Sequence, residues 1–155
     1  MTKLSRREFV ALATASAAAT TAGCANQKAM TDRRDVSTCE LLGLSATDAV
    51  AKLRKGEVTA ERYAAALLER CQQGRALNAF ITLPKERVLE AARAADRFRT
   101  SGGKLGPLHG LPIPVKDSVN TKDMPTTGGT PALRNFQPKE DAPIVRAASC
   151  CQRAL

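Results

Sequence analysis

The stretch Gly-Pro-Leu-His-Gly-Leu-Pro-Ile-Pro-Val-Lys-Asp, from Gly106 to Asp117, is a mostly apolar run that ends at a lysine, Lys116. A lysine in apolar surroundings loses its proton more readily than a solvated one and can act as a general base. A loop of mostly small polar residues follows, up to Pro131. The pattern predicts a short strand, about 113–116, that presents Lys116 to this loop as a catalytic base. The alternative is an edge-strand lysine whose amine reaches water.

Four linked motifs surround Lys116. The run opens as Gly-Pro-Leu-x-Gly-hydrophobic-Pro and closes on Val-Lys-Asp. A Thr-Thr-x-Gly turn at Thr126–Gly129 and a Pro-x-x-Asp-Ala stretch at Pro138–Ala142 follow. Through these motifs the segment Leu105–Val145 resembles the N-terminal part of the amidase signature family of serine hydrolases. The helical region Ser45–Ser101 fits the family as well.

The resemblance implies a fold and an activity. The fold is α/β, with helices sandwiching a mixed sheet in an α/β/α arrangement, and the part in this chain is expected to be mostly helical. The activity is hydrolysis of a carboxylic amide to an acid and ammonia or an amine, by a Ser–cis-Ser–Lys triad without a cofactor. Lys116 matches the base of that triad. Thr130 stands where many members carry serine, and the run Thr130–Arg134 looks like that of hydrolases acting on aryl-acetamides or indoleacetamide.

The two serines that the resemblance requires are not found in the 155 residues. The family carries the nucleophile and the cis-peptide serine in downstream loops, and a base without a nucleophile or an oxyanion site hydrolyses no amide. We therefore expect the N-terminal part of an amidase, truncated and inactive as written. A non-enzymatic truncated product or a weak binding fragment is the alternative. An amidotransferase A-subunit-like protein is a further one.

The last nine residues depart from the family's pattern. They read Ala-Ala-Ser-Cys-Cys-Gln-Arg-Ala-Leu over 147–155. In the frame that begins at the third base of each codon, the same bases can encode Leu-Leu-(Pro/Ser)-Ala-Gly-Ala-Val, which is how the family continues. We expect an amidase domain at 45–146 and an aberrant tail at 147–155, produced by a frameshift near Ala147.

The N-terminus carries an export pattern. Ser-Arg-Arg-Glu-Phe-Val, containing Arg6 and Arg7, precedes an Ala/Thr-rich stretch too weakly apolar for a membrane span. We expect a twin-arginine-type signal peptide at 1–27, a linker at 28–44, the Tat export machinery as a partner, and a periplasmic protein. Thr-Ala-Gly-Cys resembles a lipoprotein box, so that Cys24 is a candidate for lipidation. Cleavage near Ala25 competes with it, and a lipid on Cys24 would be the only membrane attachment.

Composition restricts the possible partners. The net charge is +9, but only 3% of the residues are aromatic and none is Trp. Nucleic-acid binding is therefore not expected, because single-strand binders need aromatic stacking platforms. A small amide is the expected partner of the full-length form. No spacing among the five cysteines and the single histidine resembles a metal site. Cys39 and Cys71 form a disulfide after export or stay as small buried side chains, and both alternatives stay open.

Capping residues and glycines predict the helices. The expected elements are helices at 46–55 after Ser45, 60–73 after Thr59 and 85–99 after Pro84, with strands at 79–83 and 113–116. Two neighbours of Lys116 are assigned structural roles. His109 is the only histidine and is expected to be structural rather than catalytic, and Asp117 is expected to hold the turn that follows it.

Overall fold

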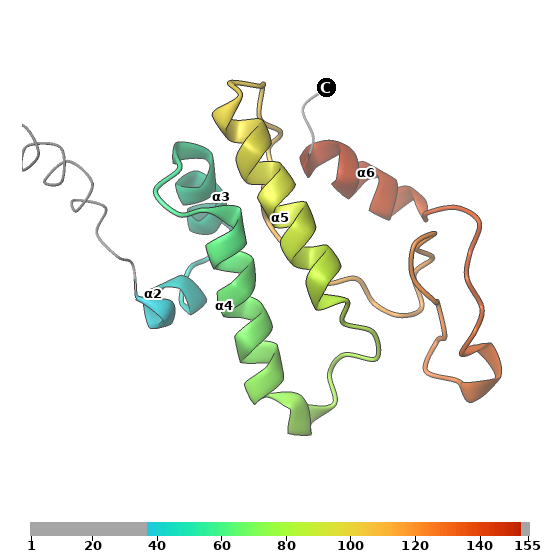
Figure 1. Cartoon of the computed structure of the whole chain (residues 1–155). Helices are drawn as coiled ribbons and strands as arrows, with labels where there is room; N and C mark the ends of the chain where they lie inside the picture. The colour runs from blue at the N-terminus through green and yellow to red at the C-terminus, as the bar shows by residue number, and fades with distance from the viewer. Residues whose placement is uncertain (1–36, 153–155) are drawn as a thin grey trace, which may run out of the picture. The chain divides into compact units, whose positions relative to one another are not determined.

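The structure, a computed structural model, describes residues 37–152 (Figure 1). The predicted signal peptide, Cys24, most of the predicted linker and the last three residues lie outside the described residues. The described chain is helical, in the order α2 (Thr38–Leu42), α3 (Ala46–Lys55), α4 (Ala60–Gln73), the 3-10 turn η1 (Arg75–Leu77), α5 (Lys85–Thr100), the 3-10 turn η2 (Pro131–Leu133) and α6 (Pro143–Gln152). None of these helices is long and apolar enough to cross a membrane.

The three predicted helices are confirmed, although α5 begins after Pro84 without a side-chain cap. The Ser45 side chain accepts a hydrogen bond from the Asp48 backbone N–H at 3.1 Å, and α3 ends at Gly56 with φ 72°. The Thr59 hydroxyl accepts from the Arg62 N–H at 3.2 Å and opens α4. Each cap satisfies a backbone group that the first or last helical turn leaves unpaired.

Helix α2 was not predicted and lies inside the range 28–44 expected to be linker. It is a single short helix held by a capping box. Glu40 N–H donates to the Ser37 hydroxyl, and Ser37 N–H donates to the Glu40 carboxylate at 2.7 Å. Leu41 anchors it, since this side chain is only 1% exposed. A polar, mixed-charge stretch therefore ends in an ordered helix because one leucine reaches the core.

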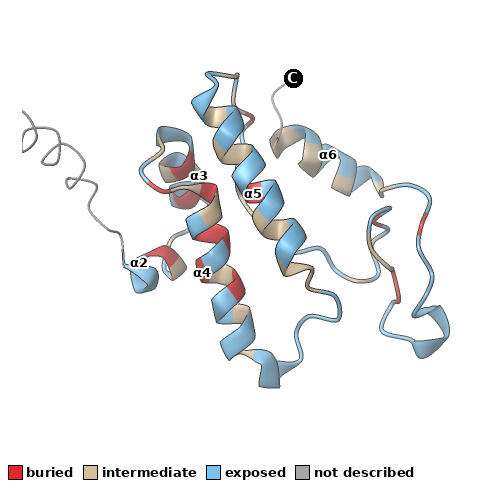
Figure 2. Cartoon of the chain, viewed as in Figure 1, coloured by how far each residue is buried: buried red, intermediate tan, exposed pale blue. Residues whose placement is uncertain are grey.

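The core lies where α2, α3 and α4 meet, with α5 packed along α4 (Figure 2). Small side chains such as Ala64 and Ala92 allow α4 and α5 to approach closely. Asp96 of α5 also caps α4, because its carboxylate accepts from the N–H groups of Ala60 at 2.8 Å and Glu61 at 3.0 Å. The buried cluster consists of Leu41, Ala49, Leu53, Val58, Ala60, Tyr63, Ala64, Ala66 and Ala92.

The two predicted strands are not formed in residues 37–152, which contain no β-strand. A strand exists only as part of a hydrogen-bonded ladder, and neither segment has a ladder partner among these residues. Pro112 and Pro114 also lack the N–H that a ladder needs. The apolar side chains of both segments stay accessible, as shown by Ile81 at 62% and Val115 at 39% exposure. The predicted strands were wrong as regular elements, although both segments become part of the site described below.

The apolar run before Lys116 contains a second glycine, Gly110, whose conformation and close packing both favour a residue without a side chain. Its φ is 72°, a left-handed conformation that residues with side chains rarely adopt. A Cβ atom there would lie 3.2 Å from the Cβ of Ala60 and 3.7 Å from a methyl of Leu53. A side chain at this position would therefore be strained by the positive φ and would crowd Ala60, where the run packs against α3 and the start of α4.

Candidate functional site

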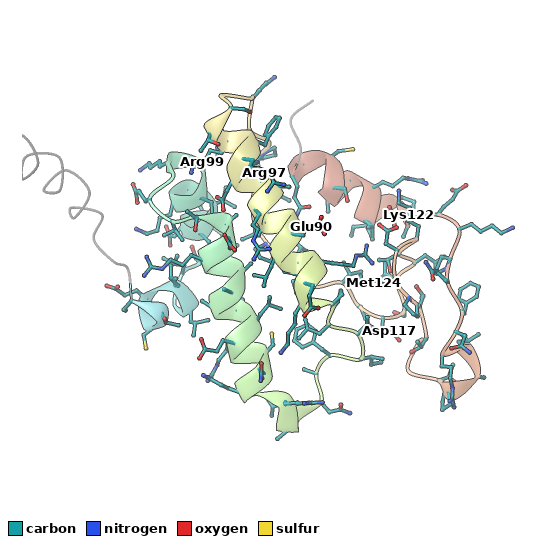
Figure 3. All side chains as sticks on the ribbon, viewed as in Figure 1. Glu90, Arg97, Arg99, Asp117, Lys122 and Met124 are labelled. Atoms are coloured by element: carbon teal, nitrogen blue, oxygen red, sulfur yellow. The ribbon has the colours of Figure 1, made fainter. Side chains whose placement is uncertain are left out.

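Lys116 lines a hollow of ≈ 610 Å³, which we call the Lys116 hollow. Both segments predicted as strands contribute to it, as does the polar loop after Lys116. The lining is formed by residues 79–82, 114–119, Thr121, Met124, Pro125, Gly128 and Gly129. The structure thus brings together, at one hollow, the lysine and the loop that the sequence indicated. Figure 3 shows Asp117, Lys122 and Met124 on this loop, between α5 and α6.

The expected apolar shelter around Lys116 is not formed by the described residues. Lys116 is exposed. Pro114 and Val115 line the same hollow, but Leu111 and Ile113 line a different cavity. The expectation failed because the run passes from one cavity to the other along its length, with residues 109–114 lining the larger cavity and residues 114–119 lining the Lys116 hollow. Within residues 37–152 the amine of Lys116 makes no hydrogen bond or ion pair.

The prediction that Asp117 holds the turn after it is confirmed. Its carboxylate accepts hydrogen bonds from the Thr127 N–H at 3.1 Å, the Thr127 hydroxyl at 2.5 Å and the Gly129 N–H at 3.0 Å. The chain also turns directly after Lys116, since its carbonyl accepts from the Val119 N–H at 2.9 Å. Sequence reasoning named Thr126–Gly129 as a motif but missed its function as the partner of Asp117.

These hydrogen bonds, with that from the Thr127 hydroxyl foremost, lower the pKa of Asp117 below its ordinary value of 3.8. A carboxyl group with a depressed folded-state pKa stabilises the fold most when it is ionised. This contribution is therefore complete above the unfolded-state pKa and is lost as the pH falls through the lower folded-state value. At neutral pH the carboxylate is a fixed negative charge in the loop beside Lys116.

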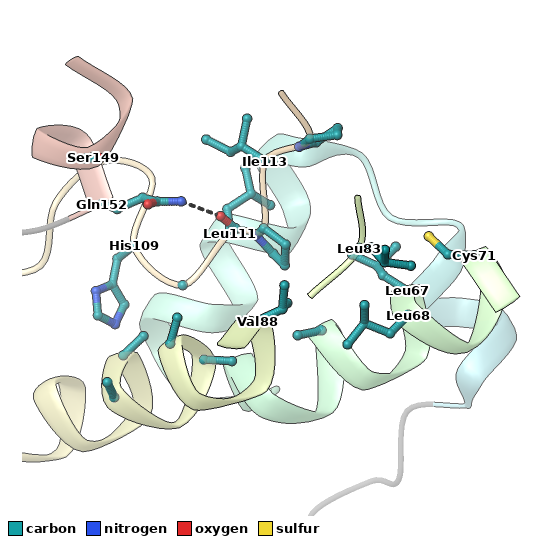
Figure 4. Close-up of a pocket in the computed structure, with 18 of the residues that line it drawn as sticks. Leu67, Leu68, Cys71, Leu83, Val88, His109, Leu111, Ile113, Ser149 and Gln152 are labelled. Carbon is teal, nitrogen blue, oxygen red and sulfur yellow. Dashed lines mark hydrogen bonds between the residues drawn. The ribbon is translucent and has the colours of Figure 1, made fainter. Parts of the chain in front are cut away.

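His109 lies in a separate cavity of ≈ 810 Å³ between α4, α5 and the run Gly106–Asp117, which we call the motif loop (Figure 4). It is only 3% exposed, its Nδ1 has no hydrogen-bond partner in the described part of the chain, and its ring centroid lies 6.1 Å from that of Phe98. It does not line the Lys116 hollow. The only histidine is thus a packed side chain away from Lys116, as the sequence suggested.

Helix α6 contains residues 147–152 of the predicted aberrant tail and contacts the motif loop. The Leu108 N–H donates to the Cys151 carbonyl at 3.0 Å, and the Gln152 side-chain amide donates to the Leu111 carbonyl at 2.7 Å (Figure 4). Residues 147–152 therefore continue the helix and hold the motif loop from a second side.

The cysteines do not pair within the described part of the chain. Cys39 is an exposed free thiol and Cys71 a partly buried one. No group of three or more His, Cys, Asp or Glu side chains in residues 37–152 is arranged to hold a metal ion.

Comparison with known proteins identifies the family. The family model described as Amidase matches residues 62–148, which include the whole Lys116 motif and the Thr126–Gly129 turn. The chain belongs to the Amidase family.

Two curated relatives and one solved structure illustrate the similarity. The chain is 41% identical over 106 residues to the A subunit of the glutamyl-tRNA(Gln) amidotransferase of Thermobifida fusca, with 68% of this chain and 21% of the relative covered. It is 39% identical over 103 residues to the indoleacetamide hydrolase of Bradyrhizobium diazoefficiens, with 66% and 20% covered. A solved fatty acid amide hydrolase superposes with a TM-score of 0.68 at 26% identity, with 81% of this chain and 22% of that chain covered.

The chain therefore spans about a fifth of the length of the curated relatives it matches. The matched structure belongs to the α/β amidase-signature enzymes, so the predicted fold class is supported at that level. The described residues supply only helices and loops of such a fold. The role of Lys116 as base stays a prediction.

Proposed function

We propose that this chain is the N-terminal part of an amide hydrolase, in which Lys116 is the general base. The observation that carries the proposal is the Lys116 hollow. It is lined by Lys116, which has no carboxylate partner among residues 37–152, beside a loop fixed by Asp117, inside a segment that matches the Amidase family. The nucleophilic serine, the cis-peptide serine and the rest of an α/β/α sheet would come from residues outside the present sequence. No cofactor takes part in this chemistry.

The substrate class we propose is an aryl-acetamide or indoleacetamide. The similarity to an indoleacetamide hydrolase supports it, as does the run Thr130–Arg134. A second candidate function is that of an amidotransferase A subunit, which the similarity to the Thermobifida fusca protein favours. The export pattern at Arg6 and Arg7 argues against it, because an exported protein does not meet charged tRNA.

A chimera tests the proposed function. Residues 59–142, from the N-cap of α4 to the residue before α6, replace the matching segment of the indoleacetamide hydrolase. We expect the chimera to hydrolyse indoleacetamide, because the grafted segment would supply a working base to the serines of the recipient enzyme. Release of indoleacetic acid is measured by chromatography. A chimera that unfolds at the temperature of the parent enzyme but releases no acid contradicts the proposal.

We also propose that the protein is exported by the twin-arginine route to the periplasm, with Cys24 as a lipid attachment site. In a fusion of residues 1–35 to a fluorescent reporter that folds before export, the substitutions Arg6→Lys and Arg7→Lys together are expected to abolish periplasmic fluorescence. Cys24→Ser is expected to move the exported reporter from the membrane to the soluble periplasmic fraction. Unchanged periplasmic delivery by the double-lysine variant contradicts the route, and unchanged membrane retention of Cys24→Ser contradicts lipidation.

A further inference from the structure

We propose that Asp117 is a positioning residue for Lys116. Its carboxylate occupies a backbone anion-binding nest at Thr127–Gly129, and this contact holds Lys116 at the hollow while keeping the carboxylate from forming an ion pair with the amine. We call Asp117, Thr127, Gly128 and Gly129 the Asp117 clamp. The inference rests on the proposed function, because it assigns a role in presenting the proposed base.

The clamp binds Asp117 through both its side chain and its main chain. One carboxylate oxygen accepts from the Thr127 N–H, and the other accepts from the Thr127 hydroxyl and the Gly129 N–H. The Asp117 carbonyl accepts from the Gly128 N–H at 3.3 Å. The Thr127 hydroxyl also accepts from the Gly129 N–H at 3.1 Å, which closes the loop on itself. Asp117, the residue next to Lys116, is therefore held through both its side chain and its carbonyl group.

The two glycines of the clamp are required by conformation rather than by space. Gly128 has φ 56° and Gly129 φ 72°, and a Cβ atom at either would meet nothing within 4 Å. The positive φ of both glycines turns the chain so that the N–H groups of Thr127 and Gly129 reach the same carboxylate. Backbone N–H groups gathered in a turn in this way form a concavity that binds an anion. In this loop the anion is the carboxylate of Asp117 itself.

The clamp also explains why Lys116 is left without an acidic partner. A carboxylate close to a lysine amine favours the charged ammonium form, which cannot accept a proton. The Asp117 carboxylate instead receives three hydrogen bonds from neutral donors. No carboxylate among residues 37–152 forms an ion pair with Lys116. The N–H groups of Thr127 and Gly129 already donate hydrogen bonds to Asp117. The groups that stabilise a substrate oxyanion must therefore lie elsewhere.

The first test uses the full 155-residue chain and the hydrogen exchange of its backbone amides, followed by NMR. Asp117→Asn keeps the shape of the side chain but places an N–H₂ group where one oxygen accepted. Thr127→Val removes the hydroxyl at constant shape, and Thr127→Ser keeps it. We expect exchange at Gly129 to accelerate about 10-fold or more in Asp117→Asn and Thr127→Val, because a hydrogen-bonding group left without its partner destabilises the folded loop. Thr127→Ser should exchange like the native chain.

The matched control is Asp123→Asn, a carboxylate of the same loop that pairs with Arg87 at 3.5 Å and lies outside the clamp. It should leave exchange at Thr127 and Gly129 unchanged. Unchanged exchange in Asp117→Asn, or equal acceleration in the Asp123 control, overturns the clamp.

The second test is kinetic and uses the chimera. We expect Asp117→Asn and Thr127→Val to lower kcat about 10- to 100-fold with KM unchanged, because misplacing a catalytic group by about 1 Å has such an effect. Thr127→Ser should restore the native kcat. A loss confined to KM, or no rescue by serine, overturns the positioning role. If the chimera with a native clamp is inactive, the proposed function fails, while amide exchange still decides whether the clamp exists.

Discussion

Replacing Lys116 by alanine in the chimera is expected to lower kcat about 10²- to 10⁴-fold, the range that general acid–base catalysis contributes. The reason is that Lys116 lines the hollow and has no acidic partner among the described residues. KM should change little, because the base acts on the proton of the nucleophile and not on the bound amide. Steady-state hydrolysis of indoleacetamide, with the thermal midpoint of each variant measured beside it, gives the result.

The matched control for this experiment is Lys122→Ala. Lys122 is exposed in the same loop, does not line the hollow, and uses only its backbone N–H and carbonyl in hydrogen bonds, to Asp141 and from Gln137 at 2.8 Å each. Its side chain is therefore dispensable, and kcat should stay at the parent value. Equal losses from Lys116→Ala and Lys122→Ala would mean that positive charge near the loop, rather than a base at position 116, supports the reaction.

Helix boundaries were predicted from sequence because their causes are local. Ser45 and Thr59 cap within three residues of themselves, and Gly56 ends a helix through its own φ of 72°. Helix α2 was missed for the opposite reason. Its capping box at Ser37 is local and visible, but the helix is retained by burial of Leu41 against residues that follow it in sequence. Local signals show that a helix can form, and tertiary contacts decide whether a short one does.

The site was predicted in part. The position of Lys116 beside a polar loop followed from its motif, and so did the role of Asp117 in holding the turn, but the Thr127 and Gly129 groups that Asp117 binds were not predicted. The surroundings of the amine did not follow. The strand predicted at 113–116 implied that apolar residues on one face would cover the Lys116 amine. The faces of a strand are fixed only when it pairs with another strand, and residues 37–152 contain no such partner. Residues 79–82 and 114–119 line the same hollow although they lie more than thirty residues apart in sequence. No local sequence pattern encodes such an arrangement.

The motif glycines show how sequence and packing combine. Gly110 has a positive φ, and an added Cβ would crowd Ala60. Gly128 and Gly129 have a positive φ in open space and serve the anion nest instead. Glycine at position 110 thus lets the motif loop pack against the helical core, whereas the glycines at 128 and 129 form the loop that binds Asp117. The core and the Lys116 hollow are linked through Gly110, so that weakening α3 should reach the motif loop.

Leu53→Ala is expected to reduce the free energy of unfolding by about 2–5 kcal/mol, the range for deleting a buried leucine side chain and leaving a cavity. Leu53 is 2% exposed in the core cluster, and one of its methyl carbons lies 3.7 Å from the place a Cβ of Gly110 would take. Removing the Leu53 side chain should therefore weaken the packing of α3 and also the packing of the motif loop against it. Urea unfolding of the 155-residue chain, followed by helical circular dichroism, measures the change.

The matched control is Leu77→Ala, the same substitution at a leucine that is 80% exposed in η1, shortly after α4. Its effect should stay within about 0.5 kcal/mol, as for surface substitutions that remove no buried contact. The contrast separates core packing from the general loss of an apolar side chain. Similar losses from the two variants would show that the Leu53 side chain is not buried in solution. Gly110 would then approach only Ala60, and packing against Leu53 would no longer help to account for a glycine at that point of the motif.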